Sequence, residues 1–190
     1  MQHDLELHGH GVRLVPRTME HSADLFALID HEMWLGMGTP TPTSPDGVAA
    51  GTAAALADPT RYAFTVLDAD TGEVRGTTSF YEVAAEAGRC DVGHTYYGRA
   101  WWGGRTNPAC KLLLFTHAFE AWGMYRIGMR ADVRNLRSIG AMERLGCVRE
   151  GVLRKHRLSA DGTRQDSVVL SMLAPEWPAA KERLLERLAV

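Results

Sequence analysis

The residues best suited to chemistry lie between Asp91 and Trp122, where a strand-like segment, a turn and a helix follow one another. The turn is rich in Gly, Arg and Trp, and the helix after it has apolar residues spaced by three and four on one face: Leu112, Phe115, Phe119 and Trp122. The first N–H groups of a helix have no intrahelical partner and lie at the positive end of the helix dipole. A strand that enters a helix through such a turn can hold a phosphate or pyrophosphate.

The turn does not match the common nucleotide motifs. The chain contains neither GxxxxGK[ST] nor GxGxxG, so nucleoside triphosphate and dinucleotide binding lose their usual support. A second polar pair, Asn135 and Ser138, stands at the head of a later helix that ends before Gly146. Taken alone, Asn135 is a good helix N-cap that accepts a hydrogen bond from the N–H of Ser138.

Composition sets broad limits on the function. The 190 residues suggest one domain, 1–190, and 21 basic against 23 acidic residues give a net charge of -2, which does not favour nucleic acid. No segment has the apolar length of a membrane span. The three cysteines are scattered without a CxxC pair, which indicates a reducing, cytoplasmic location. His3, His8 and His10 lack neighbouring carboxylate or cysteine ligands, so we expect no metal site there.

Hydrophobic periodicity and turn residues predict a mixed α/β sheet domain of the α+β type, in which helices are inserted between strands arranged in hairpins. We expect strands at Val12–Val15, Tyr62–Leu67, Val74–Tyr81, Asp91–Tyr97, Arg126–Val133, Cys147–Leu158 and Gln165–Leu173. We expect a wider turn at Glu82–Arg89, and helices at Thr18–Ile29, Pro45–Ala57 after the cap Ser44, Asn135–Leu145 and Trp177–Leu188.

The loop from Met33 to Pro45 is dense in Gly and Pro and carries Trp34 and Met37. Long loops between early helices often form a wall of a substrate site, which makes Trp34 and Met37 candidate substrate-binding residues. Covering the edge of the core is an equally good interpretation of the same apolar side chains.

Four collinear fragments resemble the GNAT family of acetyl-CoA-dependent N-acetyltransferases, and within it the Rim-type (RimJ and RimL) ribosomal-protein N-terminal acetyltransferases. They are DVGHTYY, WWGGRTNPACKLLLFTHAFE, YRIGMRADVRNLRSIGAMERLGCVREGVLR and DGTRQDSVVLSML. The resemblance implies a GNAT fold, with a mostly antiparallel mixed sheet of about seven strands, a splayed central pair and flanking helices. It also implies a substrate-side half at 10–90, an acetyl-CoA half at 91–173 and a C-terminal helix at 174–190.

The resemblance implies acetyl-CoA as cofactor and assigns it a set of residues. The thioester would lie beside Tyr96 and Tyr97, and the pyrophosphate on the main chain of Gly103–Pro108. Asn135 would hydrogen-bond the pantetheine, and the Ser138 hydroxyl would protonate the leaving thiolate. The full set is Tyr96, Tyr97, Gly103, Gly104, Arg105, Thr106, Asn107, Lys111, Asn135 and Ser138.

Two positions depart from the family pattern. Arg105 stands where a central glycine is usual, so we expect its guanidinium to turn outward and contact a phosphate of the cofactor. Lys111 either adds positive charge for the same phosphates or is a solvated helix residue. At the position where Rim-type enzymes place a basic Glu, this chain has Arg157.

The general base is therefore open among other residues. His156, next to Arg157, can titrate near neutral pH. Asp91, at the start of its strand, and Glu82, on the preceding turn, are the carboxylate candidates, and Glu82 is also a candidate for substrate binding.

We expect transfer of an acetyl group from acetyl-CoA to a primary amine by direct attack in a ternary complex. The cysteines are not placed beside an activating His, so an acetyl-cysteine intermediate has little support. The amine is a protein N-terminus or a small molecule, and no nucleic-acid or membrane partner is expected. The alternative is a catalytically inactive CoA-binding module that acts through protein contacts. The sequence leaves homodimerisation open.

Overall fold

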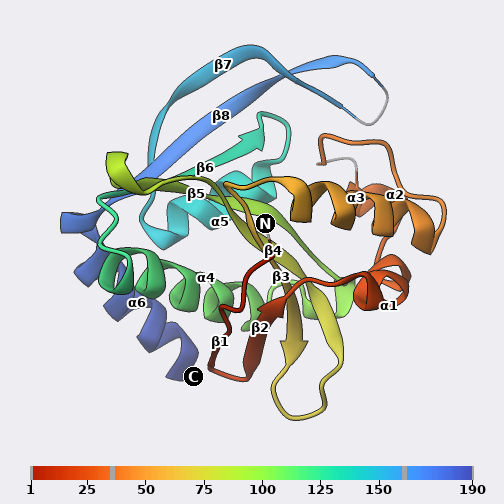
Figure 1. Cartoon of the computed structure of the whole chain (residues 1–190). Helices are drawn as coiled ribbons and strands as arrows, with labels where there is room; N and C mark the ends of the chain where they lie inside the picture. Colours follow the sequence, from red (N-terminus) through yellow and green to blue (C-terminus); the bar gives the residue numbers. More distant parts are fainter. Residues whose placement is uncertain (1, 35–36, 160–161, 190) are drawn as a thin grey trace.

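The computed structural model describes residues 2–34, 37–159 and 162–189. Within them, one sheet of eight strands has the order β1-β2-β3-β4-β5-β6-β8-β7, and all neighbours are antiparallel except the parallel pair β5–β6 (Figure 1). The strands are β1 Leu7–Gly9, β2 Val12–Pro16, β3 Tyr62–Asp68, β4 Val74–Ala84, β5 Arg89–Tyr97, β6 Arg126–Asp132, β7 Val148–Leu158 and β8 Arg164–Leu173. The predicted mixed, mostly antiparallel sheet is confirmed, with the short β1 as an additional strand.

The helices are α1 Ser22–Ala27, α2 His31–Trp34, α3 Pro45–Ala57, α4 Thr106–Thr116, α5 Leu136–Leu145 and α6 Trp177–Ala189. Figure 1 shows α4 and α6 on one side of the sheet and α1 to α3 on the other. The helix expected at Thr18–Ile29 is shorter than predicted, because Met19–His21 forms a 3-10 turn before α1. A π-helical turn, His117–Ala121, continues α4.

Local sequence signals explain where several helices begin and end. The Ser44 hydroxyl accepts from the N–H of Gly47 at the start of α3, with Pro45 in the first turn as predicted. The Asn135 side chain accepts from the N–H of Ser138, 3.0 Å away, and caps α5. Gly146 ends α5 with φ 98°, a left-handed conformation that favours glycine.

The main core lies between the sheet and the helices α4, α5 and α6. Phe64 and Phe80 from the sheet and Phe115 from α4 are fully buried in it, and burial of each ring contributes about 2–3 kcal/mol. A smaller second cluster joins Leu25 and Val48 of α1 and α3 to Tyr96 of β5. The two clusters fix β5 from both faces.

Two searches of the described residues set limits on other functions. No described helix is long and apolar enough to cross a membrane. In the same part of the chain, no group of three or more His, Cys, Asp or Glu side chains is placed to hold a metal ion. The His3 ring packs against Tyr62 and Phe64 at the edge of the core.

Candidate active site

The centre of the candidate site is a gap between the parallel strands β5 and β6. They pair only from Arg89–Asp91 with Arg126–Gly128, and beyond this point β5 stays with β4 while β6 stays with β8. The facing edges of the two strands therefore keep backbone N–H and C=O groups outside the ladder, where an extended ligand with amide groups can pair with them.

The end of β5 leads into the turn before α4, which Trp102 holds in place. The Trp102 indole N–H donates to the carbonyl of Tyr97, 2.7 Å away. Gly103 has φ 72°, a left-handed conformation that lets the chain turn back toward the helix. Gly104 is exposed, and Thr106 and Asn107 open α4, where helix geometry leaves their N–H groups without intrahelical partners. This turn has the anion-binding form expected from the sequence.

Arg105 is exposed, but its guanidinium points to a protein partner. It donates to the carbonyl of Leu188 near the end of α6, where a cation compensates the negative end of the helix dipole. Phosphate contact by Arg105 stays a prediction, since it requires the guanidinium to leave this carbonyl.

A different arginine lies over the turn without an acidic partner. Arg137, in the first turn of α5, stacks on the Trp102 ring with its guanidinium carbon 3.5 Å from the ring centroid. Arg99 stacks on the same ring at 4.8 Å, but two acids of the α1–α2 region, Asp30 and Glu32, hold it in ion pairs. Sequence reasoning did not single out Arg137, although it lies within the N-x-x-S segment. It is the cation of this turn best placed to meet a ligand phosphate.

Lys111 is 5 % exposed, so the prediction of a solvated helix residue is wrong. It lies one to two turns into α4 on the buried face, because the helix period brings it to the same side as Leu114 and Phe115. Burial lowers the pKa of Lys111 to about 8, opposed by the nearby thiols of Cys110 and Cys147. No acidic side chain among the described residues forms an ion pair with it.

Asn135 and Ser138 stand at the start of α5, beyond the last residue of β6. The Asn135 side-chain oxygen is engaged by the N–H of Ser138, which confirms the N-cap. The Ser138 hydroxyl is half-buried and makes no hydrogen bond to another described residue. It is therefore available to a ligand, as the role of proton donor requires.

The predicted wall residues Trp34 and Met37 lie beside Tyr96. The Trp34 ring meets the Tyr96 ring edge-on at 5.2 Å, and Met37 packs against the same cluster. The Trp34 indole N–H donates to the carbonyl of Thr39, 2.9 Å away, and so anchors the following loop. Burial raises the pKa of Tyr96 to about 12, so this phenol stays neutral. Part of the predicted loop, residues 35–36, lies outside the described residues.

The carboxylates of Asp91 and Glu82 meet at one arginine. Arg130 donates to Glu82 at 2.6 Å and to Asp91 at 2.9 Å. Asp91 is buried at the point where β5 and β6 part, and a Cβ on Gly128 would overlap with its carboxylate. Glu82 lies within β4, with φ 48° in a bulge, and not on a turn as predicted, because β4 continues to Ala84.

His156 and Arg157 are adjacent on β7, in a strand whose register is irregular. β7 has a bulge between Leu153 and Arg157, so simple alternation cannot predict which side chain faces which way. The His156 ring lies 3.1 Å from the hydroxyl of Ser167 on β8. The Arg157 guanidinium approaches Gly38, at 2.6 Å from the position of an added Cβ. Asp91, Ser138 and His156 thus belong to three separate sets of contacts.

A bulge in β5 exposes His94 on the same strand as Tyr96. His94 and Thr95 lie opposite the single residue Thr78, and His94 has φ 49°. Its ring packs edge-on against Tyr81, with centroids 4.8 Å apart. The pKa of His94 is lowered to about 4, first by burial and then by the charge of Arg61, against Asp58. His94 is therefore neutral at pH 7.

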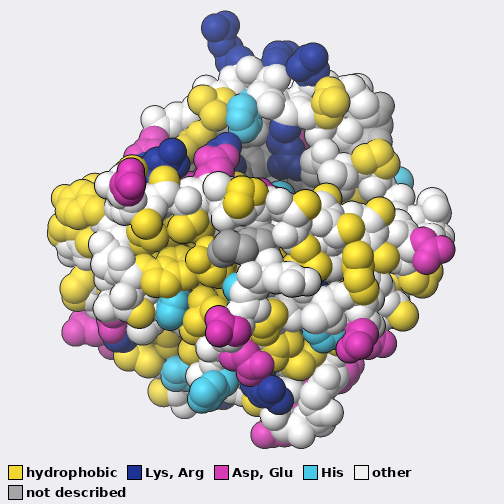
Figure 2. Space-filling view, in the orientation of Figure 1, with side chains coloured by type: hydrophobic (Ala, Val, Ile, Leu, Met, Phe, Trp, Pro, Cys, Tyr) yellow, Lys and Arg dark blue, Asp and Glu magenta, His cyan; other side chains and the backbone are white. Residues whose placement is uncertain are grey.

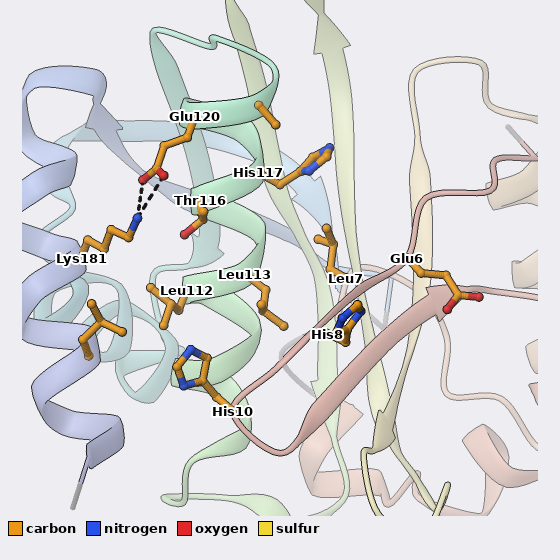
Figure 3. Close-up of a pocket in the computed structure, with 12 residues that line it drawn as sticks. Glu6, Leu7, His8, His10, Leu112, Leu113, Thr116, His117, Glu120 and Lys181 are labelled. Atoms are coloured by element: carbon orange, nitrogen blue, oxygen red, sulfur yellow. Dashed lines mark hydrogen bonds and ion pairs between the residues drawn. The ribbon is translucent and has the colours of Figure 1, made fainter.

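A separate groove of about 580 Å³ runs between β1, α4 and α6 (Figure 3). Figure 3 shows His8 and His10 facing α4 across it, with the Lys181–Glu120 ion pair on the far side. His117 also lines it, and its ring packs against Trp122. None of the lining residues comes from β5 or β6, so this groove is distinct from the gap in the sheet.

Residues 12–148 match the domain described as Acetyltransferase (GNAT) domain. The chain belongs to the GNAT acetyltransferase family. A GNAT protein from T. thermophilus, described as an acetyltransferase, has 34% identity and a TM-score of 0.90, with 98% of each chain covered. Mycobacterium smegmatis RimJ, solved with CoA-disulfide, shares the GNAT fold with a TM-score of 0.80 at 19% identity, over 96% of this chain and 92% of that one.

Curated GNAT relatives match a shorter part of the chain. YoaA of Bacillus subtilis, called an uncharacterized N-acetyltransferase, is 29% identical over 106 residues, 56% of this chain and 59% of YoaA. The chain spans about three fifths of the length of the curated relatives that it matches. The resemblance to the GNAT family drawn from the sequence is confirmed, and RimJ is among the proteins that share its fold.

Proposed function

We propose that this GNAT protein transfers the acetyl group of acetyl-CoA to a primary amine by direct attack in a ternary complex. The observation that carries the proposal is the gap between β5 and β6, whose open backbone edges fit the amide groups of a pantetheine arm. The CoA-bound state of RimJ supports the same ligand. Acetyl-CoA supplies the activated acetyl group, and every other contribution comes from residues of the chain.

The residues that would hold the cofactor follow the gap. The N–H groups at Gly103–Asn107 face an anion at the N-terminus of α4, and Arg137 adds a cation above them. Asn135 holds the start of α5, and Tyr96 and Tyr97 form the wall at the end of β5. Arg105 and Lys111 are secondary candidates, since one is bonded to Leu188 and the other is buried.

The proposed chemistry is a nucleophilic attack in which the nitrogen–carbon bond forms and the carbon–sulfur bond breaks. Ser138 donates a proton to the leaving thiolate, since its hydroxyl has no other described partner. The bulge at His94 frees backbone groups of β5 from the ladder near Tyr96, where an N–H can polarise the acetyl carbonyl. Asp91 and His156 are the two candidates for the base that takes the proton of the amine.

The acceptor is a protein N-terminus or a small amine bound on the side of Trp34, Met37 and Glu82. Self-association and a reducing location are further proposals; all three cysteines are buried and free, and size-exclusion chromatography reports on self-association.

Thiol release from acetyl-CoA with a panel of amines tests the proposed function, with calorimetric CoA binding in parallel. We expect turnover above hydrolysis for at least one amine. Binding without transfer would instead support an inactive CoA-binding module, and absence of CoA binding would refute both. The pH profiles of Asp91→Asn and His156→Gln identify the base, since only its loss removes the acidic limb of kcat/KM.

A further inference from the structure

Three arginines from distant parts of the chain surround His94. Arg17 follows β2, Arg61 precedes β3, and Arg157 lies in β7. The positive charges of Arg61, Arg157 and Arg17 each lower the pKa of His94, and Asp58 is the one acid that acts on it in the opposite direction. Figure 2 shows a hollow below the β7–β8 hairpin with Lys or Arg side chains on its wall. The protein therefore gathers positive charge next to the bulge of β5.

Arg17 is the most unusual of the three because its charge is buried. It is 7 % exposed and donates one long hydrogen bond, 3.4 Å, to the carbonyl of Val48. Its Nε has no hydrogen-bond partner among the described residues, and no described acid forms an ion pair with it. Burial lowers the pKa of Arg17, and the phenol of Tyr96 is the group that opposes this effect. A buried donor without a partner points to a ligand that supplies one.

Arg61 shows that these like charges are held together at a cost. Burial and then the charge of Arg17 lower the pKa of Arg61 to about 10, and the charge of Asp58 opposes them only in part. The Arg61 Nε donates to the hydroxyl of Ser79 on β4, which fixes the guanidinium beside β5. Like charges brought together in a recess are a feature of functional sites.

The cluster lies next to the expected position of the reacting groups. His94 precedes Tyr96 by two residues on β5, and Arg17 acts electrostatically on Tyr96 itself. Arg157 reaches the same region from the other side, where its guanidinium packs against Gly38 of the loop that carries Trp34 and Met37. An acceptor held by these arginines would lie on the substrate side of the gap between β5 and β6.

We propose that the acceptor is a small amine that also carries a carboxylate or phosphate, and that Arg17, Arg61 and Arg157 bind this anionic group. The proposal rests on the proposed acetyl transfer and names its substrate class. An anion satisfies the free Nε of Arg17 and compensates the mutual repulsion of Arg17 and Arg61. A cationic or polyamine acceptor would add to that repulsion.

Matched pairs of amines test the proposal. Initial rates of thiol release are compared for β-alanine against β-alaninamide, and for O-phosphoethanolamine against ethanolamine, at saturating acetyl-CoA. We expect kcat/KM to be at least about tenfold higher for an anionic member than for its neutral partner. Equal rates within each pair, or faster reaction of the neutral amines, would overturn the substrate class and leave acetyl transfer standing. A panel in which CoA binds but no anionic amine reacts also counts against it.

Variants separate charge recognition from a structural role. Arg61→Gln and Arg157→Gln are expected to lower kcat/KM for the anionic amine about tenfold and to leave the neutral amine and the CoA Kd unchanged. Arg154→Gln, an exposed arginine on the same strand as Arg157, is the control and should change neither rate. Equal losses for both members of a pair would contradict the proposal. Circular dichroism verifies that each variant is folded.

Discussion

Replacing the buried Lys111 by Met should stabilise the protein near neutral pH. The pKa of Lys111 is lowered from 10.5 to about 8, mainly by burial. Below pH 8 the lysine is protonated in both states, so the folded state bears the full cost, about 3 kcal/mol. Between pH 8 and 10.5 the unfolded chain binds more protons than the folded chain, so wild-type stability rises with pH. At pH 10 the remaining cost is about 1 kcal/mol.

The assay is urea unfolding of wild type and Lys111→Met at pH 7 and pH 10. We expect the variant to be more stable by about 3 kcal/mol at pH 7 and by about 1 kcal/mol at pH 10. Other titrating groups are common to both proteins and cancel in the difference. Lys155→Met, whose side chain is 69% exposed, is the control and should stay within about 0.5 kcal/mol of wild type. A variant less stable than wild type at pH 7 would show that the ammonium is stabilised in the folded protein, which refutes the reasoning.

Three further predictions concern the gap and its rim. Gly128→Ala should cost about 1–3 kcal/mol in urea unfolding, because the new Cβ overlaps with the Asp91 carboxylate, whereas Gly151→Ala, with open space around it, should cost far less; equal costs would contradict the packing. Asn135→Ala should cost about 1 kcal/mol through loss of the N-cap, and a raised CoA Kd in calorimetry would add the proposed ligand contact. Arg137→Gln should raise the KM for acetyl-CoA about tenfold with little change in kcat, and an unchanged KM would exclude a phosphate contact.

The sequence predicted most of the fold because its local signals agree with the tertiary structure. The cap at Ser44, the N-cap at Asn135 and the stop at Gly146 all lie where expected. Errors arose where the backbone departs from regular alternation. The bulge that contains Glu82 extends β4 into a segment that reads as a polar turn. A bulge costs one residue of register, and nothing in a single sequence marks its position.

The site was predicted less completely, for a different reason. Arg17, Arg61 and Arg157 are far apart along the chain, and each one alone resembles a surface arginine. Only the fold brings them together around His94. Arg137 was missed in the same way, since its position above Trp102 depends on how α5 packs beside the turn. Motif spacing finds residues that act within one segment, and long-range charge clusters require the three-dimensional arrangement.

The gap between β5 and β6 also makes ligand binding part of the folding equilibrium. A ligand whose amides pair with both strands completes the sheet, so it binds the native state and not the unfolded chain. Mass action then raises the free energy of unfolding by about 2.7 kcal/mol when free CoA is 100-fold above its Kd. The melting temperature should therefore increase with CoA concentration, and the cellular level of CoA would set how long the chain stays folded.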